Sequence, residues 1–227
     1  MSFVGIAIIL RKDAQKSYFR DSLLHLIQMP GTNRLLLCSG YISEGKYSIL
    51  NDRLIDAMRR GCSGKGSEVV LIGGRFYGTQ AYSWIRRFDR FIQGMQAGGI
   101  RVSPFISPKG KWHAKIAMKL KNNIPMAAII GSSNLTGPAY REGYSGFSHE
   151  CDVVIWREDA SLNRYFSEWI LRERNSQNPF SPIEANLNRD SSQPMEGERM
   201  DALYHEIMNM DLLESFDIWK KRKNYEQ

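Results

Sequence analysis

The sequence has few cysteines and no apolar run long enough to cross a bilayer. Its three cysteines, Cys38, Cys62 and Cys151, are an odd number without a CxxC pair. This spacing argues against a disulfide framework and against a cysteine-based zinc site, so we expect a reducing, cytoplasmic setting. The apolar stretch 3–10 has eight residues, whereas a membrane helix needs about 20. The sequence therefore predicts neither an integral membrane protein nor a secreted disulfide scaffold, and no membrane partner.

Acidic residues are also in the minority. The 227 residues include 31 Lys and Arg against 24 Asp and Glu, a formal charge of +7, while 42% hydrophobic residues indicate an ordinary globular chain. Between Arg101 and Pro125 there are six basic residues and no acidic one. An excess of positive charge favours polyanionic partners such as nucleic acid.

Strand and helix patterns alternate along the first half of the chain. Strands are expected over 34–42, 68–74 and 100–106, and amphipathic helices over 47–60 and 79–97. This order implies right-handed crossovers, so we predict an α/β fold with a mixed, largely parallel sheet flanked by helices.

The pattern changes after residue 111. Period-two alternation over 112–119, the pair Asn122-Asn123 and an apolar run over 126–130 predict a β-hairpin. A further strand over 151–156 and a helix over 159–173 follow. We divide the chain into a core over 1–175, a linker or surface loop over 176–198 that is rich in Asn, Ser, Pro and Gln, and a C-terminal segment over 199–227. That segment is expected to form one helix with a basic end.

Two short motifs fall on the predicted hairpin. His113-Ala114-Lys115 lies on its first strand, where side chains at i and i+2 share a face. Gly131-Ser132-Ser133-Asn134 follows its second strand. Antiparallel pairing is expected to bring Asn134 beside His113 and Lys115. An imidazole, an ammonium and an amide on one surface suit the binding and transfer of a phosphate.

These residues resemble the phospholipase D superfamily, whose signature combines HxK with a later GSxN. The resemblance covers roughly residues 30–172 and includes the extension Leu135-Thr136. The family's Asp would fall five residues after Lys115, where this chain has Leu120. Some nuclease members lack that Asp and place a Glu on the strand after GSxN, a position that Glu150 matches. The resemblance therefore implies a phospholipase D-like catalytic domain of the nuclease branch, similar to those of certain restriction endonucleases.

The resemblance implies a two-step phosphoryl transfer without a metal or other cofactor. One histidine attacks the phosphodiester to form a phosphohistidine, a second protonates the leaving oxygen, and water hydrolyses the intermediate. His113, Lys115, Asn134, Glu150 and Ser132 match the catalytic positions. The remaining histidines are not followed by Lys at i+2, so the chain supplies half of such a site. A homodimer that places two copies of His113 opposite each other would complete it.

We also expect Lys111, Lys119, Trp112 and Ser133 to contact the substrate, because both lysines share strand parity with His113 and the indole offers a stacking surface. The leading hypothesis is a metal-independent endonuclease that cleaves DNA as the nuclease part of a restriction system. Two alternatives stay open. One is a phospholipid phosphodiesterase or transferase that uses the same site, and the other is a nucleic-acid-binding dimer that has lost catalysis.

Overall fold

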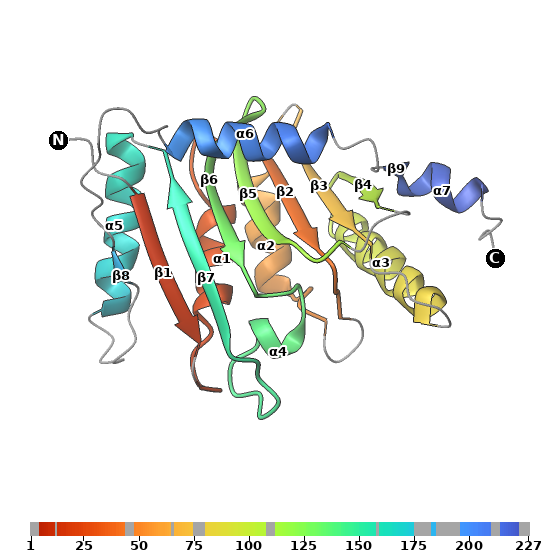
Figure 1. Ribbon diagram of the computed structural model, residues 1–227, viewed down its shortest axis with the longest axis horizontal. Coiled ribbons are helices and arrows are strands. Elements are labelled where there is room, and N and C mark those ends of the chain that lie inside the picture. The colour runs from red at the N-terminus through yellow and green to blue at the C-terminus, as the bar shows by residue number, and fades with distance from the viewer. Residues whose placement is uncertain are drawn as a thin grey trace.

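A single nine-stranded sheet organises the protein in the computed structural model (Figure 1). The structure describes residues 5–11, 13–43, 48–64, 66–74, 80–107, 112–157, 159–174, 183–184, 196–209 and 214–222. The strands are β1 (Gly5–Arg11), β2 (Arg34–Ser39), β3 (Glu68–Gly73), β4 (Val102–Ile106), β5 (Lys115–Lys121), β6 (Ile124–Gly131), β7 (Glu150–Trp156), β8 (Ile183–Glu184) and β9 (Glu214–Ser215). Their order across the sheet is β8-β1-β7-β6-β5-β2-β3-β4-β9.

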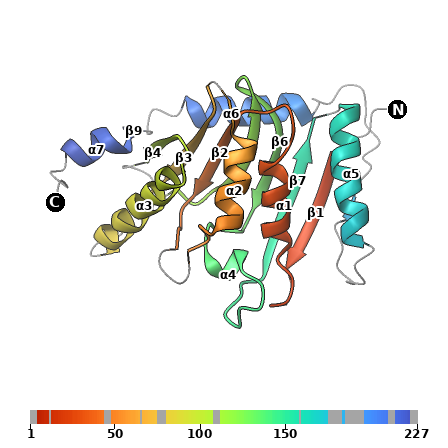
Figure 2. The same cartoon turned by 180° about the vertical axis from the view of Figure 1, so that it is seen from behind.

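Seven helices accompany this sheet in the described part of the chain. They are α1 (Tyr18–Ile27), α2 (Asp52–Gly61), α3 (Gln80–Ala97), α4 (Gly137–Tyr140), α5 (Ala160–Arg174), α6 (Glu196–Met208) and α7 (Phe216–Arg222). Helices α1, α2, α3 and α5 cover one face, and α6 crosses the opposite face (Figures 1 and 2). The predicted mixed α/β architecture with flanking helices is confirmed.

The expectation of a largely parallel sheet is wrong. Only the pairs β2–β3 and β3–β4 are parallel among the eight pairings between described strands. Parallel neighbours need a long crossover, which α2 and α3 provide for those two pairs. The other central strands are joined by the β5–β6 hairpin and the β6–β7 connection, and β1 pairs antiparallel with β7 from the far end of the sequence.

Alternation along the strands divides the apolar residues into two clusters. On β2, Leu35 and Leu37 belong to the cluster under α1, α2, α3 and α5, whereas Leu36 and Cys38 belong to the cluster on the opposite face. Side chains at successive strand positions point to opposite faces, which explains this division. We call these clusters the first core and the second core.

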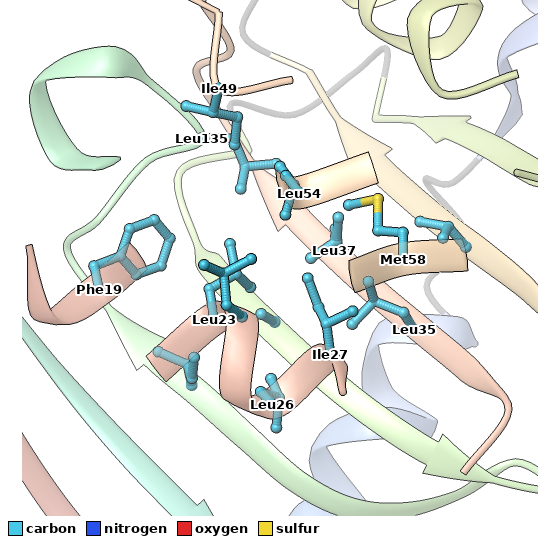
Figure 3. Packing of buried hydrophobic residues seen from close by; sticks show 14 of the residues in the cluster. Phe19, Leu23, Leu26, Ile27, Leu35, Leu37, Ile49, Leu54, Met58 and Leu135 are labelled. Atoms are coloured by element: carbon cyan, nitrogen blue, oxygen red, sulfur yellow. The ribbon is translucent and has the colours of Figure 1, made fainter. Parts of the chain in front are cut away.

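Helices α1 and α2 are fixed by their caps and by the first core. The side chain of Ser17 accepts a hydrogen bond from the backbone N–H of Arg20, and that of Asn51 accepts one from Leu54. Such caps satisfy backbone donors that a helix start leaves unpaired. The second cap explains why α2 begins at Asp52 instead of at residue 47. Figure 3 shows Leu23 of α1 and Leu54 of α2 on the same side of β2, in one continuous cluster.

The predicted hairpin is present. Strands β5 and β6 pair antiparallel, and the two residues between them, Asn122 and Asn123, have positive φ angles of 50° and 69°. Two positive φ angles are typical of a two-residue turn whose twist matches the flanking strands, and asparagine tolerates this conformation better than most residues. The hairpin is the scaffold on which the two sequence motifs lie.

The segment over 199–227 differs from the single helix that we predict. Its described residues form α6 and α7, with β9 before α7. Met200, Tyr204 and Ile207 of α6 are buried in the second core, and Phe216 of α7 packs against Phe88 of α3 with ring centroids 4.9 Å apart. The C-terminal helices are therefore packed against the sheet and α3. Among the described residues, none of the helices is both long and apolar enough for a membrane span.

A partly buried histidine joins α1 to α5. The His25 ring stacks on Tyr165 with centroids 3.9 Å apart, and its Nε2 lies 3.2 Å from the Tyr165 carbonyl oxygen. Burial lowers the pKa of His25 to about 4. The ring is therefore neutral in the folded protein near neutral pH, where Nε2 donates to that carbonyl.

This burial predicts that acid destabilises the fold through His25. A histidine in the unfolded chain titrates near pH 6.5, so between about pH 6.5 and pH 4 the unfolded state binds the additional proton. The free energy of unfolding is then expected to fall with pH by up to a few kcal/mol. Denaturant unfolding at pH 7 and pH 5 measures this loss. It should shrink in His25→Phe and persist in His205→Phe, whose histidine is exposed. An equal loss in both variants would contradict the assignment.

Candidate active site

The strand register brings the two motifs to one edge of the sheet. Lys115 at the start of β5 pairs with Gly131 at the end of β6, and Gly131 pairs with Asp152 near the start of β7. The three residues thus form a row across neighbouring strands, at the lower edge in Figure 1, where α4 also lies. An isolated bridge between Ile42 and Leu135 attaches the chain after β2 to the same loop.

His113 and Lys115 are in contact. The Lys115 Nζ lies 3.0 Å from Nδ1 and 3.1 Å from Nε2 of the imidazole, and it donates to the His113 carbonyl oxygen at 2.5 Å. His113 precedes β5 instead of lying on it, so the contact comes from Lys115 reaching back over the chain. His113 is exposed and Lys115 is 8% exposed. The predicted pair therefore presents a reachable ring above a mostly buried ammonium.

Close backbone packing holds His113 in place. A Cβ at Gly40, just after β2, would lie 2.2 Å from the Trp112 carbonyl oxygen. The backbone N–H of Trp112 donates to the Gly74 carbonyl at 2.8 Å, and the Trp84 indole donates to the Gly40 carbonyl at 3.0 Å. A residue larger than glycine at position 40 would push the histidine segment outward.

The loop after β6 is shaped by Asp152, which sequence reasoning missed. Its carboxylate accepts hydrogen bonds from the Ser133 backbone N–H at 3.1 Å and from the Ser133 hydroxyl at 2.6 Å. Both residues are 2% exposed. A Cβ at Gly131 would lie 2.2 Å from Asp152 Oδ1, so only glycine fits there. One sequence signal could have identified Asp152: it is an acidic residue at a position of β7 whose side chain the alternating pattern directs into the protein.

Ser132 and Glu150 form a second polar pair at this edge. The Ser132 hydroxyl donates to Glu150 Oε2 and accepts from the backbone N–H of Cys151 at 3.0 Å. Burial raises the pKa of Glu150, against the lowering effect of the Ser132 and Ser148 hydroxyls. Desolvation likewise raises the pKa of Asp152. These two serines are the hydrogen-bond donors to Glu150 within the described residues, and no imidazole is among them.

Asn134 is oriented by β2. The Ser39 hydroxyl donates to the Tyr41 carbonyl oxygen at 2.7 Å and lies 3.4 Å from Asn134 Oδ1. With Oδ1 on the side of Ser39, the NH₂ group of the amide is the donor that Asn134 can offer to a ligand. Ser39 was not identified from the sequence, since a serine at a strand end gives no signal of its own.

Arg11 is a further residue that the sequence analysis missed. It is 2% exposed, and its guanidinium donates to the carbonyl oxygens of Pro138 and Ala139 at 2.7 Å and of Arg141 at 2.5 Å. It also pairs with Glu150 in the β1–β7 register. A single buried guanidinium thus fixes the α4 loop beside the site.

The structure corrects three of the expected substrate contacts. Lys119 shares the parity of Lys115 but is fully buried, and its Nζ donates to the Gly61 carbonyl at 2.5 Å beside Cys62 Sγ. Trp112 is 8% exposed and belongs to the second core, and Ser133 is bound to Asp152. These three side chains support the fold and offer no surface to a substrate. Lys111 lies outside the described residues.

The polar groups at this edge are of the types that suit a phosphate. His113 offers a ring nitrogen, Lys115 a positive charge, and Asn134 an amide donor, while Ser132 and Glu150 supply a hydroxyl and a carboxylate at the same edge. Within the described part of the chain, no three His, Cys, Asp or Glu side chains converge as a metal-binding group. The arrangement suits nucleophilic attack on phosphorus with charge stabilisation by lysine and amide.

Comparisons with solved structures find similarity at low sequence identity. Polyphosphate kinase from Porphyromonas gingivalis aligns over 78% of this chain and 25% of its own at 17% identity and a TM-score of 0.43. NucT from Helicobacter pylori aligns over 80% of this chain and 99% of its own at 13% identity and a TM-score of 0.40. Phosphatidylserine synthase from Haemophilus influenzae Rd KW20 aligns over 92% and 47% at 12% identity and a TM-score of 0.47. This chain spans a quarter of the first structure and about half of the third.

The search of curated proteins finds no match. A family model does match, over residues 19–178, and its description is the NgoFVII restriction endonuclease N-terminal PLD domain. The matched range contains both motifs, Glu150 and the four central strands β2, β5, β6 and β7. The chain therefore belongs to the family of NgoFVII restriction endonuclease N-terminal PLD domains.

Proposed function

We propose that this protein is a metal-independent endonuclease that cleaves DNA through a phosphohistidine on His113, within a restriction system. The observation that carries the proposal is the contact between the Lys115 ammonium and the exposed His113 ring. Lys115 Nζ lies 3.0 Å and 3.1 Å from the two ring nitrogens, so a phosphate bound at the His113 ring would also meet the ammonium. A positive charge at that place favours an anionic group and stabilises the charge that develops on its oxygens.

The reaction divides into two displacements at phosphorus. In the first, an imidazole nitrogen of His113 uses its lone pair to form an N–P bond, and the P–O bond to the leaving strand breaks. A second imidazole gives its proton to the departing oxygen. In the second displacement, that imidazole takes a proton from water, the water oxygen bonds to phosphorus, and the N–P bond breaks. Lys115 and the Asn134 amide stabilise the phosphate oxygens in both steps, which replaces the charge of a metal ion.

The second imidazole comes from a second copy of the chain, because this sequence has one HxK element. An apolar strip on β1 and β7 ends at the site edge and suits such a partner. Ile8 and Leu10 are 38% and 39% exposed, and they pair with Val153 and Cys151 on the face opposite the first core. The next pair in the register is Arg11 with Glu150, whose side chains point to the other face, so the strip ends at the edge of the sheet that holds the candidate active site.

Glu150 is assigned the role of fixing an imidazole tautomer. Its hydrogen-bond donors within the described residues are serines of its own chain, so its imidazole partner in the proposed dimer is that of the second copy. Ser132 holds the carboxylate in place until the partner ring arrives.

Cleavage of plasmid DNA in excess EDTA tests the chemistry. The wild type is expected to cleave, and His113→Ala to lose about 10⁴-fold or more in rate, as other enzymes do when they lose a nucleophile. Lys115→Ala should lose activity more than binding, since its charge acts on the transition state. His205→Ala, which removes an exposed histidine on α6, is the matched control. Cleavage that requires magnesium, or hydrolysis of a choline phospholipid instead of DNA, would contradict the proposal.

The raised pKa of Glu150 predicts the acid limit of the activity. Because its pKa is raised, the Glu150 carboxylate becomes protonated at a higher pH than an ordinary glutamate does. As the pH is lowered, activity should therefore decline at a pH above about 4.3, the ordinary pKa of glutamate. Glu150→Gln should reduce kcat by about 10²-fold or more and remove this limb from the pH profile. Glu206→Gln, exposed on α6, should leave the profile unchanged. A wild-type limb at ordinary glutamate pH would argue against the role.

The shared site predicts that activity depends on dimerisation. Ile8→Lys places a charge in the apolar strip and should produce monomers that do not cleave DNA, because burial of an unpaired charge is costly. Ile124→Lys is the control, since Ile124 is 51% exposed on the hairpin turn, away from the strip. Sedimentation velocity and cleavage are measured on the same samples. A wild-type monomer with full activity would refute the shared site.

A further inference from the structure

A cavity of about 330 Å³ lies in the helix layer, away from the candidate active site. Figure 2 shows the three helices that supply most of its walls, α2, α1 and α5, side by side. Four basic residues and one acidic residue line the cavity, which gives it a net charge of +3: Lys16, Arg20, Arg53, Arg172 and Asp21. His25, which also lines it, is uncharged near neutral pH because burial lowers its pKa to about 4.

The positive charge of this cavity is only partly neutralised. Asp21 is shared between Lys16 Nζ at 2.9 Å and Arg20 Nη2 at 2.8 Å, and Arg20 also pairs with Glu142 at 2.5 Å. Arg53 and Arg172 are exposed, and no ion pair joins either to a carboxylate of the described residues. Two guanidinium groups at one cavity without a counter-charge favour an anionic ligand, and guanidinium suits phosphate in particular.

The buried part of the lining is apolar and aromatic. Leu24 is 4% exposed and Trp169 is 3% exposed, and the Trp169 ring stacks on His25 with centroids 5.5 Å apart. The indole Nε1 of Trp169 is buried without a hydrogen-bond partner among the described residues. The exposed guanidinium groups and the indole N–H are all hydrogen-bond donors, which suit the acceptor oxygens of a phosphate group.

Hydrogen bonds and an ion pair connect helix α1, which lines the cavity, to the α4 loop at the edge of the candidate active site. The Ser17 hydroxyl, at the start of α1, donates to the Ala139 carbonyl at 2.9 Å, and the Ser17 backbone N–H donates to Glu142 at 3.2 Å. Arg20 pairs with Glu142 from the next turn. The α4 loop that Arg11 holds beside Glu150 is therefore also held by the helix that lines the cavity.

We propose that this cavity binds the phosphate group of a nucleotide, as a site separate from the catalytic one. The proposal rests on the proposed function for the source of that phosphate, a nucleic-acid strand that also enters the active site. A free nucleotide offers the same chemistry, and the experiment separates the two sources.

The test compares two double variants with the wild type. Arg53→Ala/Arg172→Ala removes the two guanidinium groups that lack a carboxylate partner. Arg60→Ala/Arg164→Ala removes the same charge from exposed positions of α2 and α5 that do not line the cavity. Calorimetric titration uses a deoxynucleoside 5′-monophosphate, the same nucleoside without phosphate, and orthophosphate.

Wild type and control variant should bind the monophosphate with equal affinity, and the cavity variant should bind it at least about tenfold more weakly, the loss expected for charged hydrogen bonds. The nucleoside alone should not bind. Equal affinity in all three proteins, an equal loss in the control variant, or tight binding of the nucleoside would overturn the proposal.

Cleavage of a short single-stranded oligonucleotide identifies the source. A raised KM with unchanged kcat in the cavity variant alone indicates that the phosphate belongs to the bound strand. Unchanged values of KM and kcat indicate that it belongs to a free nucleotide. Either conclusion requires that the cavity variant has lost monophosphate binding. The monophosphate contains no diester bond, so its binding does not depend on catalysis. If the wild type binds the monophosphate through the cavity but does not cleave DNA, the endonuclease is refuted and the cavity site is not. If it cleaves DNA in EDTA but all three proteins bind the monophosphate equally, the cavity site alone is refuted.

Discussion

A lysine that turns back onto its own chain is the interaction on which the rest of the site depends. The Lys115 ammonium is almost removed from water, and burial of a charge is costly unless polar groups surround it. The His113 carbonyl and ring supply such groups within 3.1 Å. Because the ammonium needs polar neighbours, it orders the histidine that precedes the strand, and the proposed nucleophile is positioned by the same contact that stabilises the lysine.

The remaining polar residues of the edge are arranged around that pair by the sheet. The register aligns Lys115, Gly131 and Asp152, and the glycine allows the carboxylate to approach the loop backbone closely. Asp152 is hydrogen-bonded to Ser133, whereas the exposed Ser132 is paired with Glu150, which is 9% exposed. One acid therefore shapes the loop and the other is the proposed catalytic carboxylate, although they stand two residues apart on one strand.

Local sequence signals were sufficient for the hairpin and for its two motifs. The Asn122-Asn123 turn sets the register of β5 and β6, and the register then brings Lys115 to the GSSN loop without any further information. The antiparallel majority of the sheet was not predictable in this way, since β1 pairs with β7 across most of the chain. The contact of Asp152 with Ser133 could have been suspected from an acid on an inward strand position, but its geometry depends on the close approach at Gly131.

The alternation of side chains along the strands did not predict which of them are buried. It placed Lys119 correctly on the face of Lys115, but it contains no information on what covers that face, and α2 covers Lys119 completely. Trp112 was likewise assigned to the surface from its neighbours in the sequence, although it packs in the second core with residues of α6. Candidate catalytic groups can thus be proposed from a motif, whereas the burial of the neighbouring side chains depends on helices distant in the sequence.

The central claim is that one nitrogen of His113 becomes covalently bound to the phosphorus of the substrate. The most direct measurement is mass spectrometry of protein quenched in alkali during turnover of an oligonucleotide, because phosphohistidine survives alkali and phosphoesters of serine do not. The account predicts a nucleotidyl or phosphoryl adduct on the peptide that contains His113, absent from His113→Ala. Rapid cleavage without an adduct, or an adduct on another residue, would contradict it.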